Sequence, residues 1–527
     1  MERLSRQDKL NRLGITDWDL LVIGGGISGA GVLREAARLG WKVLLIEQRD
    51  FAWGTSSRSS KLVHGGLRYL KEGQFRTTLH SVHERQRLMR EAPELIEPQS
   101  FLFADCTGRQ PGRWLFQLGL TIYDHMAGEN SHAYCSSQAV AQLAPGLAPD
   151  KLRGGMVYRD AKTDDARLVW RVLEEAEHDG GIAINYLAAR TPIIAHGQLA
   201  GMVLEDIETG QQIAVQARTV INATGAWADR LRATLGRKPM LRPLRGSHLI
   251  VPFWRLPVAQ AVSLMHPRDG RPVFFYPWEG ATLIGTTDLD HAGDLDTEAS
   301  ITDAEVDYLL EAVNDQFPAI QLGRADVSAC YAGVRPVVDE GGNSPSSAGR
   351  DHVVLDEQGL ITLTGGKLTT FRLMAQDALA LAAKRMSQPY QPSTAPVFSA
   401  ASNLPPQLAG AMAQRLRARY GPHAAEVANT ATADTLAFVP GTHTLWQELQ
   451  RAARVESVVH LDDLLLRRTR LGILLPRGGL DHLVRIRALC QPELGWTDAH
   501  WEAELLRYQQ LIARHYSLPP TRTESAP

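Results

Sequence analysis

A glycine-rich turn between a buried strand and a helix is the feature that most restricts the fold. Residues 19–50 read DLLVIGGGISGAGVLREAARLGWKVLLIEQRD, and the apolar run at 20–23 predicts a buried parallel strand. The glycines that follow in a GxGxxG pattern are Gly24, Gly26 and Gly29. Because Glu47 ends the next strand, where a carboxylate can accept from a ribose hydroxyl, the segment predicts a dinucleotide site in an α/β domain. A glycine-rich turn without a ligand is the alternative.

The residues after Glu47 favour FAD over NAD as the dinucleotide. In NAD dehydrogenases the second strand is normally followed by a further helix and strand of the same unit, whereas here the chain continues as WGTSSRSSKLVHGG, residues 53–66. FAD has a longer body, which extends past the first strand–helix–strand unit. The departure therefore indicates FAD.

Two later segments repeat the pattern of strand, glycine and helix. Residues 218–231, RTVINATGAWADRL, form an apolar strand that ends in Ala-Thr-Gly and resembles the second nucleotide-contacting segment of flavoproteins of the glutathione-reductase class. Residues 361–384 predict a strand, a Gly-Gly pair and a helix that begins within 367–369. Backbone N–H groups exposed at such a helix start suit the electron-rich edge of a flavin. Each segment taken alone also fits an ordinary strand-to-helix corner.

The region between these two segments predicts an antiparallel sheet. Residues 243–252, 273–288 and 330–340 alternate apolar with polar side chains and contain prolines and turn residues. His248 lies there in a short polar island, Arg-Gly-Ser-His, for which a structural role is the usual interpretation. Arg335 lies in Gly-Val-Arg-Pro, and an arginine inside an apolar strand is costly unless it meets an anion.

Composition excludes several classes of partner and site. Lys and Arg total 56 against 58 for Asp and Glu, so the chain lacks the basic excess that binds phosphate backbones, and we expect no nucleic-acid partner. The 527 residues, 44% of them hydrophobic, favour a globular protein of two or more units. The four cysteines stand far apart without metal-ligand spacing, which indicates a reducing compartment and no metal site. They are Cys106, Cys135, Cys330 and Cys490.

No segment predicts secretion or a membrane span. The N-terminus lacks the apolar stretch of a signal peptide, and no apolar run approaches the ~20 residues that cross a bilayer. We therefore expect a cytoplasmic protein or one attached to a membrane face. Residues 113–126, RWLFQLGLTIYDHM, fit either a core helix, which we favour, or a helix in the membrane interface.

The last quarter of the chain differs in pattern from the rest. Proline and serine are frequent over residues 386–408, which predicts a linker. Beyond it, apolar residues recur at helical spacing, and three arginines cluster within this helical region. A solvated face is the usual role of such a cluster, contact with acidic lipid is another, and we favour a contact between domains. The three are Arg467, Arg468 and Arg470.

Taken together, the motifs resemble those of one family. IGGGISGAG, TSSRSSKLVHGGLRYL, DDARL, NATGAW, GSH, IGTTD, GVRP and GGKLTT, in this order, are similar to the FAD-dependent glycerol-3-phosphate dehydrogenases of the aerobic, quinone-reducing type. VVHLDDLLLRRTRLGILL, residues 458–475, is similar to the helical cap domain of that family. The likeness spans most of the chain.

The resemblance implies an α/β fold in which a Rossmann-like FAD-binding domain of the glutathione-reductase class is interleaved with an antiparallel-sheet substrate domain, followed by a C-terminal all-α domain. The expected parts are an N-terminal extension (1–18), an oxidoreductase domain (19–385), a linker (386–408) and a helical cap domain (409–527). Within 19–385 we expect FAD-binding parts at about 19–100, 150–235 and 345–385, and a substrate-binding part at about 236–344.

The family activity implied is oxidation of sn-glycerol 3-phosphate to dihydroxyacetone phosphate, with electrons passing through FAD to ubiquinone or another quinone. The family's catalytic positions fall on Arg68, His248 and Arg335, with His248 as the candidate base that takes the C2 hydroxyl proton. Its substrate-contacting positions fall on Arg68, Tyr69, Arg335, Lys367 and Thr369. The family often has Lys where this chain has Arg245, which leaves the role of that side chain open.

The stretch after Glu47 is expected to serve both cofactor and substrate. Its hydroxyl residues can reach the phosphate and ribityl parts of FAD, its middle can run beside the ring, His64 is a packing residue there, and Arg68 is aimed at the substrate phosphate. The residues expected to contact FAD are Gly24, Gly26, Ile27, Ser28, Gly29, Glu47, Gln48, Thr55, Ser56, Ser57, Lys61, Leu62, His64, Gly65, Gly66, Leu67, Ala223, Thr224, Gly225, Gly366, Lys367, Leu368 and Thr369.

Other functions remain open on the sequence alone. One is an FAD-dependent amine or amino-acid oxidase of similar scaffold, and another is a glycerol-3-phosphate oxidase that uses oxygen. A third is a flavin-binding module without turnover, such as a partner in RNA modification, which the pI of about 6.8 disfavours. The resemblance also implies peripheral attachment to the inner face of the cell membrane, and a homodimer is a further expectation.

Overall fold

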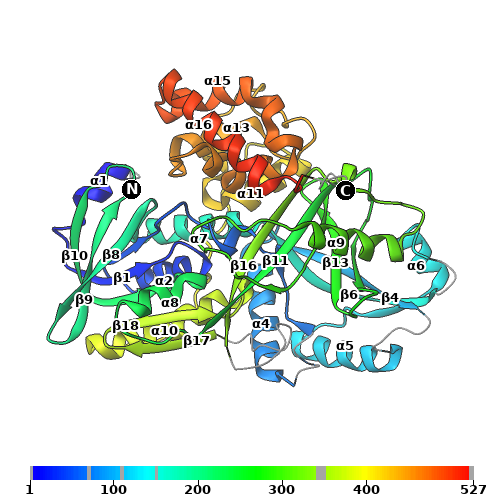
Figure 1. Cartoon of the computed structure of the whole chain (residues 1–527), viewed down its shortest axis with the longest axis horizontal. Coiled ribbons are helices and arrows are strands. Elements are labelled where there is room, and N and C mark those ends of the chain that lie inside the picture. The colour runs from blue at the N-terminus through cyan, green and yellow to red at the C-terminus, as the bar shows by residue number, and fades with distance from the viewer. Residues whose placement is uncertain are drawn as a thin grey trace, which may run out of the picture.

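The computed structural model describes residues 4–67, 70, 73–106, 112–148, 152–339 and 352–520, which form two sheets and a C-terminal group of helices (Figure 1). In the view of Figure 1 the sheet that holds the N-terminal strands lies at the left, the second sheet lies at the right, and the C-terminal helices lie above both. The fold predicted from the sequence is confirmed at this level.

The first sheet is parallel at its centre. Its strands are β1 (Trp18–Ile23), β2 (Val43–Ile46), β7 (Ile182–Ile184), β8 (Leu187–Ala195), β9 (Gln198–Asp206), β10 (Gln212–Asn222), β17 (His352–Glu357) and β18 (Leu360–Gly365). The order is β17-β18-β10-β1-β2-β7, in which only β17 is antiparallel to its neighbour, and β8 and β9 extend from β10 as an antiparallel layer. This arrangement brings strands that are far apart in sequence to one edge, where they can share a ligand.

Strand β1 is buried on both of its faces. Leu20 and Val22 pack into a core formed with helices α2 (Ile27–Arg38), α7 (Asp165–His178) and α10 (Phe371–Met386), whereas Leu21 packs into a core with β8, β9 and β10. A parallel strand covered on both sides reads as a continuous apolar run rather than an alternation. The strand predicted from residues 20–23 is therefore confirmed.

The second sheet is antiparallel apart from one parallel pair, β4 with β12. Its strands are β3 (Leu62–Val63), β4 (Ile96–Cys106), β5 (Ala133–Ser136), β6 (Leu152–Thr163), β11 (Leu241–Pro252), β12 (Ala261–Met265), β13 (Pro272–Trp278), β14 (Ala281–Gly285), β15 (Leu289–Asp290) and β16 (Ala329–Val338). Strands β3 and β6 and the first residues of β4 lie within the ranges expected for FAD binding, yet these strands pair into this sheet. The antiparallel sheet thus begins earlier in the chain than the boundary expected at residue 236.

Shorter helices complete the two sheet layers. They are α1 (Arg6–Asn11), α4 (Phe75–Glu91), α5 (Arg113–Ala127), α6 (Ser137–Leu143), α8 (Ala228–Ala233) and α9 (Asp303–Gln316). Helix α1 is tied to the first sheet by an ion pair of 2.9 Å between Arg6 Nη2 and Asp206 Oδ1. In the part of the chain that the structure describes, no helix combines the length and the apolar character needed to cross a bilayer.

The C-terminal region is helical, as predicted. Its helices are α11 (Gly410–Tyr420), α12 (Ala424–Asn429), α13 (Trp446–Val455), α14 (Leu471–Leu474), α15 (Leu483–Leu494) and α16 (Asp498–Leu511), joined by shorter turns. Before it, residues 387–409 contain no helix or strand, although Val397 and Phe398 are buried against the core that holds α2 and α10. This connection is therefore packed onto the first sheet's helices along part of its length.

Arginines of the C-terminal region are buried against the sheet domain. Both oxygens of Asp50, which follows β2, accept from Arg468 at 2.7 Å, and Arg467 binds the same carboxylate. Arg470 pairs with Asp164 at 2.9 Å and also with Asp165, at the start of α7. The contact between domains that we favoured for this cluster is confirmed.

Candidate functional site

The first motif forms a tight turn from β1 into α2. Gly24 has a φ of +115°, and a Cβ on it would lie 2.5 Å from the carbonyl oxygen of Ala223 at the end of β10. A side chain on Gly29 would overlap the carbonyl of Gly24. These positions admit only glycine, because β1, α2 and β10 approach each other here with no room for a Cβ.

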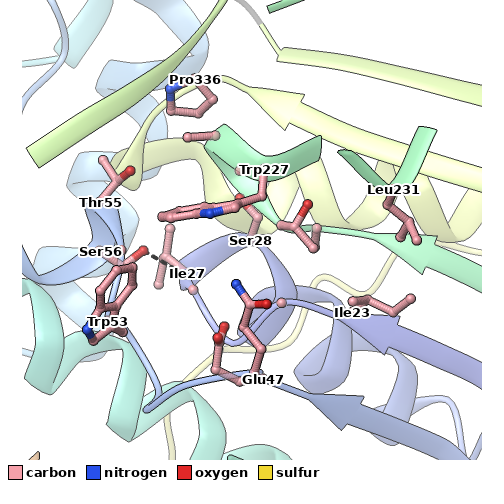
Figure 2. A pocket seen from close by; sticks show the side chains of 18 of the residues that line it. Ile23, Ile27, Ser28, Glu47, Trp53, Thr55, Ser56, Trp227, Leu231 and Pro336 are labelled. Carbon is pink, nitrogen blue, oxygen red and sulfur yellow. Dashed lines mark hydrogen bonds between the residues drawn. The ribbon is translucent and has the colours of Figure 1, made fainter. Parts of the chain in front are cut away.

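Helix α2 begins where the turn opens onto a cavity. Gly26 is its N-cap and offers no side chain, and instead Ser56 accepts a hydrogen bond from the backbone N–H of Ile27 at 3.0 Å, drawn as the dashed line in Figure 2. Ser56 comes from the loop after β2, so this bond fixes the loop to the helix start. A helix N-terminus with free N–H groups favours a phosphate at this point.

The cavity has a volume of about 400 Å³ and extends from β8 and α8 to the helix start before α10. The loops after β1, β2, β10 and β18 all contribute to its walls, as expected at the carboxyl edge of a parallel sheet. The lining residues that the sequence predicted are Gly24, Gly26, Ile27, Ser28, Glu47, Gln48, Thr55, Ser56, Ala223, Thr224, Gly225, Gly366, Lys367 and Leu368. A cavity whose wall contains this glycine turn, the acid after β2 and the later strand-to-helix corners fits an FAD.

Two tryptophans border this cavity. The rings of Trp53 and Trp227 have centroids 5.7 Å apart, and Figure 2 shows the Trp227 ring lying across the pocket from Glu47. The indole N–H of Trp227 donates to Asp296 at 3.2 Å, and the Arg49 guanidinium lies 4.2 Å from the Trp53 ring centroid. Neither tryptophan was assigned a role from the sequence, although Trp227 belongs to the NATGAW motif.

Glu47 is held by the backbone beside the turn. Its carboxylate accepts from the N–H of Gly25 at 2.7 Å and from the N–H of Arg49 at 2.9 Å. Burial raises the pKa of Glu47 above its ordinary value, while the two backbone hydrogen bonds oppose the rise. The carboxylate lines the cavity at the end of β2, where a ribose is expected.

A second cavity of about 310 Å³ lies against the first, between the two sheets. The two share the wall formed by Thr55, Ser59, Pro336 and residues 365–368. Predicted residues that line the second cavity are Thr55, Leu62, His64, Gly66, Leu67, Arg335, Gly366, Lys367, Leu368 and Thr369. The loop after β2 thus borders one cavity at its start and the other at its end.

Two arginines share one carboxylate at the wall of the second cavity. Asp288 accepts from Arg335 at 2.8 Å and pairs with Arg271 at 3.2 Å. Gly246 makes room for this arrangement, because a Cβ there would overlap the guanidinium of Arg335. Arg335 therefore meets an anion from the protein itself, and the arginine pair forms a site of positive charge.

Lys367 lies at the junction of the two cavities, where the strand β18 turns toward α10. Its ammonium donates to the hydroxyl of Ser81 on α4 at 2.9 Å. Thr369 is buried and donates to the carbonyl of His64 at 3.2 Å. One turn of 3-10 helix, Leu368–Thr370, precedes α10, so the regular helix begins later than residues 367–369 suggested.

His248 lies behind the second cavity rather than in its wall. Its side chain is 1% exposed, and Nε2 is 2.9 Å from the hydroxyl of Ser60, which does line the cavity. Burial lowers the pKa of His248 well below 6.5, and the charges of Arg335 and Lys61 lower it further. The imidazole is therefore neutral at physiological pH.

Several other predicted residues also lie away from both cavities. Lys61 is fully buried, and its ammonium binds Asp165 and the carbonyl of Ser57, each at 3.0 Å. Arg245 pairs with Glu305 at 2.9 Å. The predicted cofactor residues that line neither cavity are Gly29, Ser57, Lys61 and Gly65. Arg68 and Tyr69 lie outside the described residues.

Sequence reasoning missed the residues that only the fold brings to the cavities. Arg190 on β8 and Arg230 on α8 line the first cavity, and no local motif assigned them a role. Arg271, which directly precedes β13, and Asp288, the last residue of the IGTTD segment that begins in β14, form the charged wall of the second cavity. The IGTTD motif itself was the one available signal for Asp288.

Comparison with known proteins places these observations in a family. Residues 19–376 match the family described as FAD dependent oxidoreductase, and residues 361–501 match the C-terminal domain of alpha-glycerophosphate oxidase. The chain is 37% identical over 399 residues to the aerobic glycerol-3-phosphate dehydrogenase of Staphylococcus haemolyticus, covering 74% of this chain and 71% of that protein. It is 34% identical to glycerol-3-phosphate dehydrogenase 2 of Mycobacterium tuberculosis, covering 95% and 89%.

The fold matches a solved structure over nearly its whole length. The glycerol-3-phosphate dehydrogenase from Bacillus halodurans, solved in complex with FAD, superposes with a TM-score of 0.76 at 27% sequence identity. The match covers 96% of each chain. The likeness therefore includes both sheets and the C-terminal helices.

Proposed function

This chain belongs to the FAD-dependent oxidoreductase family, in its aerobic glycerol-3-phosphate dehydrogenase branch, and we propose that it oxidises sn-glycerol 3-phosphate to dihydroxyacetone phosphate. The observation that carries the proposal is the pair of adjoining cavities, one with a phosphate-binding turn and one with a cationic wall. Lys367 and Thr55 border both, so a substrate in the second cavity lies next to a cofactor in the first.

FAD is the cofactor of this family, and the first cavity provides for its parts. The N–H groups at the start of α2 suit the pyrophosphate, Glu47 suits a ribose, and the helix start after Gly366 suits the flavin edge. Bound FAD supplies the acceptor for the hydride that leaves C2 of the substrate. The protein's contribution is to hold the substrate in position and to manage charge and protons.

We propose that Arg335, Lys367 and Arg68 hold the phosphate of the substrate, with Thr369 and Tyr69 beside them. A phosphate monoester carries nearly two negative charges, and guanidinium groups offer forked hydrogen bonds to it. Support comes from the wall where Arg335 and Arg271 share Asp288, since two guanidinium groups beside one carboxylate leave a net positive charge at the cavity.

We propose that His248 takes the proton of the C2 hydroxyl as hydride leaves C2. The imidazole is neutral, because burial and two nearby cations oppose its protonation, so it is available as a base. With the phosphate fixed, removal of the proton from the C2 hydroxyl oxygen and of the hydride from C2 produces the ketone. The charge of Arg335 also lowers the pKa of His248. We propose that the same guanidinium stabilises the alkoxide that develops at C2.

Anaerobic reduction of the bound flavin tests this function. Purified holoenzyme mixed with sn-glycerol 3-phosphate in the absence of oxygen is expected to lose its visible flavin absorption. Glycerol, glycerol 2-phosphate and glycine serve as controls, and we expect them to leave the absorption unchanged. Reduction by glycine or sarcosine instead would assign the protein to the amine oxidases, and no reduction by the phosphate ester would refute the proposal.

For the electron acceptor we propose ubiquinone or another quinone, with oxygen as the rival. Reoxidation of the reduced protein by a soluble quinone and by dissolved oxygen, followed in parallel, separates the two. Faster reoxidation by quinone supports a dehydrogenase, whereas oxygen as the better acceptor, with formation of hydrogen peroxide, supports an oxidase.

A membrane-facing surface on α5 is proposed as the site of peripheral attachment at the inner face of the cell membrane. The helix buries Leu120 and Tyr123 on one side, while Trp114, Leu115 and Leu118 are exposed by 75%, 66% and 57% on the other. An aromatic and two leucines on one helix face suit the lipid interface, where a quinone is dissolved. The buried residues of α5 and the residues proposed to contact lipid thus lie on opposite faces of the helix.

Flotation with lipid vesicles tests this attachment. We expect the protein to float with vesicles that contain acidic lipid, and Trp114→Ser with Leu118→Ser to abolish flotation while leaving flavin reduction intact. Flotation of the double variant at the wild-type level would move the membrane contact to another surface.

A further inference from the structure

The position of His248 raises a difficulty for direct proton transfer, and this inference rests on the proposed function. The side chain is buried and lies outside the set of residues that line the second cavity. A general base must reach the proton it takes within hydrogen-bond distance or through one intervening group. Some group in the cavity wall must therefore connect His248 with a substrate hydroxyl.

Ser60 is the group between the two. Its hydroxyl oxygen lies 2.9 Å from Nε2 of His248, and its side chain lines the second cavity. A hydroxyl can accept a proton and donate its own at the same time, which is the property that a relay requires. Ser60 lies in the loop after β2 that borders both cavities, so its hydroxyl is placed beside the substrate and close to the cofactor.

The backbone on either side of Ser60 is held in place. Tyr276 donates to the carbonyl of Ser60, and Tyr331 donates to the carbonyl of Ser59 at 2.9 Å. Asp165 accepts from both the N–H and the hydroxyl of Ser59, at 3.0 and 2.7 Å. Such anchoring fixes the direction of the Ser60 side chain before any substrate arrives.

The orientation of the His248 imidazole is also fixed by its neighbours. Its ring stacks on Tyr331 with centroids 4.7 Å apart and an interplanar angle of 14°, and Gly285 on the next strand leaves room for it, because a Cβ there would overlap the ring. Nδ1 is buried with no hydrogen-bond partner among the described residues, so Nε2 is the nitrogen with a defined proton-transfer partner.

We propose that Ser60 is a catalytic residue that relays the proton of the substrate's C2 hydroxyl to His248. The Ser60 oxygen accepts the hydroxyl proton and gives its own proton to Nε2, so that the imidazole becomes an imidazolium. The C2–H bond breaks with its electron pair leaving for the oxidised flavin, and the C2–O bond becomes a carbonyl. The proton returns through Ser60 to water after the product leaves.

The test compares Ser60→Ala, Ser60→Thr and His248→Gln by anaerobic stopped-flow reduction of the holoenzyme. Ser60→Ala is expected to slow flavin reduction about 10²–10⁴-fold, the range for loss of acid–base catalysis. Ser60→Thr keeps the hydroxyl and is expected to restore most of the rate. The dissociation constant of glycerol 3-phosphate, taken from the concentration dependence of flavin reduction, should be unchanged in Ser60→Ala. The Ser60 hydroxyl transfers the substrate's proton and does not bind its phosphate.

A double variant distinguishes one relay from two separate contributions. Because Ser60 and His248 act in one chain of transfers, Ser60→Ala with His248→Gln is expected to reduce flavin no more slowly than the slower single variant. If the rate of flavin reduction in the double variant falls by the product of the two single decreases, the relay is wrong. A wild-type rate in Ser60→Ala would also show that it is wrong. Ser328→Ala, which removes a hydroxyl that binds the carbonyl of Ile250, controls for loss of a serine hydroxyl away from the cavities.

Two measurements without turnover complete the test. The flavin absorption spectrum and the melting temperature of Ser60→Ala should equal those of the wild-type protein, which shows that a slow rate does not come from a lost cofactor or a disturbed fold. If the wild-type protein is not reduced by glycerol 3-phosphate at all, the proposed function fails. If the wild type is reduced and Ser60→Ala is reduced equally fast, only the relay fails.

Discussion

Arginines at the contact between the domains and arginines at the second cavity meet carboxylates in different ways. At the domain contact, Arg467 and Arg468 are both 2% exposed and converge on Asp50, which is fully buried. At the cavity, the side chains of Arg335 and Arg271 are 25% and 23% exposed, and they converge on Asp288. The motif is the same, two guanidinium groups on one carboxylate, but only the second is open to solvent.

The difference in exposure separates a structural role from a binding role. Buried charges must be fully paired, because an uncompensated charge in the interior costs several kcal/mol. The domain contact therefore cannot bind another ion without breaking one of its existing ion pairs. At the cavity, the guanidinium groups are partly exposed, and their positive charge favours an anionic substrate. Removing a charge should therefore affect folding in the first region and ligand affinity in the second.

The largest effect is expected for Asp50→Ala. Loss of this carboxylate leaves Arg467 and Arg468 buried without their shared partner, and we expect the free energy of unfolding to fall by about 3–5 kcal/mol. Urea unfolding followed by circular dichroism measures it. The control is Asp434→Ala, whose carboxylate pairs with Arg485 on the surface and should contribute less than about 1 kcal/mol. Equal losses in the two variants would show that burial does not distinguish these pairs.

A smaller effect, on affinity rather than folding, is expected for Arg335→Met. Hydrogen bonds to charged groups contribute about 1.5–3 kcal/mol, so binding of glycerol 3-phosphate should weaken about tenfold to 100-fold while bound FAD and the melting temperature are retained. The concentration dependence of anaerobic flavin reduction gives the dissociation constant. An unchanged constant would show that the cavity arginine only balances Asp288.

The pH dependence of flavin reduction should be weak. His248 is faced by Arg335 and Lys61, which carry charge, and by the ring of Tyr331, and its pKa lies well below 6.5 because of burial first and these charges second. The base is therefore neutral across the neutral range, and the limiting rate should stay constant between about pH 8 and 6.5. A midpoint near 6.5, the value of an exposed imidazole, would place another histidine or an open site in this role.

The smallest effect is expected at the rim of the domain contact, from His460. It bonds to Glu504 at 3.0 Å and faces Glu208 of the sheet domain at 3.5 Å, and the hydrogen bond to Glu504 holds its pKa above 6.5 despite burial. Protonation thus favours the folded state below pH 6.5, and this contribution is lost as pH rises through the raised pKa. The difference in unfolding free energy between wild type and His460→Gln should shrink from pH 6 to pH 8. A difference that grows with pH would show that protonation of His460 destabilises the folded state.

Local pattern was sufficient to predict the fold class and the first cavity. The glycine turn at Gly24, the acid at Glu47 and the strand before Gly225 are each defined by residues close together in sequence, and the parallel sheet brings them to one edge without further information. The contact between domains at Arg467 was favoured from the sequence over the more usual solvated face, and the ion pair with Asp50 confirms it.

The second cavity was less predictable because its residues come from strands that meet only in the folded sheet. Arg271 and Arg335 lie 64 positions apart and meet through Asp288, and no local spacing marks such an encounter. The position of His248 behind the cavity wall could not be predicted for the same reason, because the packing of β11 between β14 and β16 encloses the side chain. Lys61, which was predicted to contact FAD, points toward Asp165 and away from the cavity.

The link from Arg470 to Asp165 has a consequence for how the protein is made. Asp165 anchors Ser59 and Lys61 in the loop that borders both cavities, and Arg470, 305 positions later in the chain, binds the same carboxylate. During synthesis most of the sheet domain emerges first, so Asp165 has no Arg470 partner until the ribosome has added the C-terminal helices. Cofactor capture should accordingly lag behind completion of the sheets and coincide with emergence of the last helices.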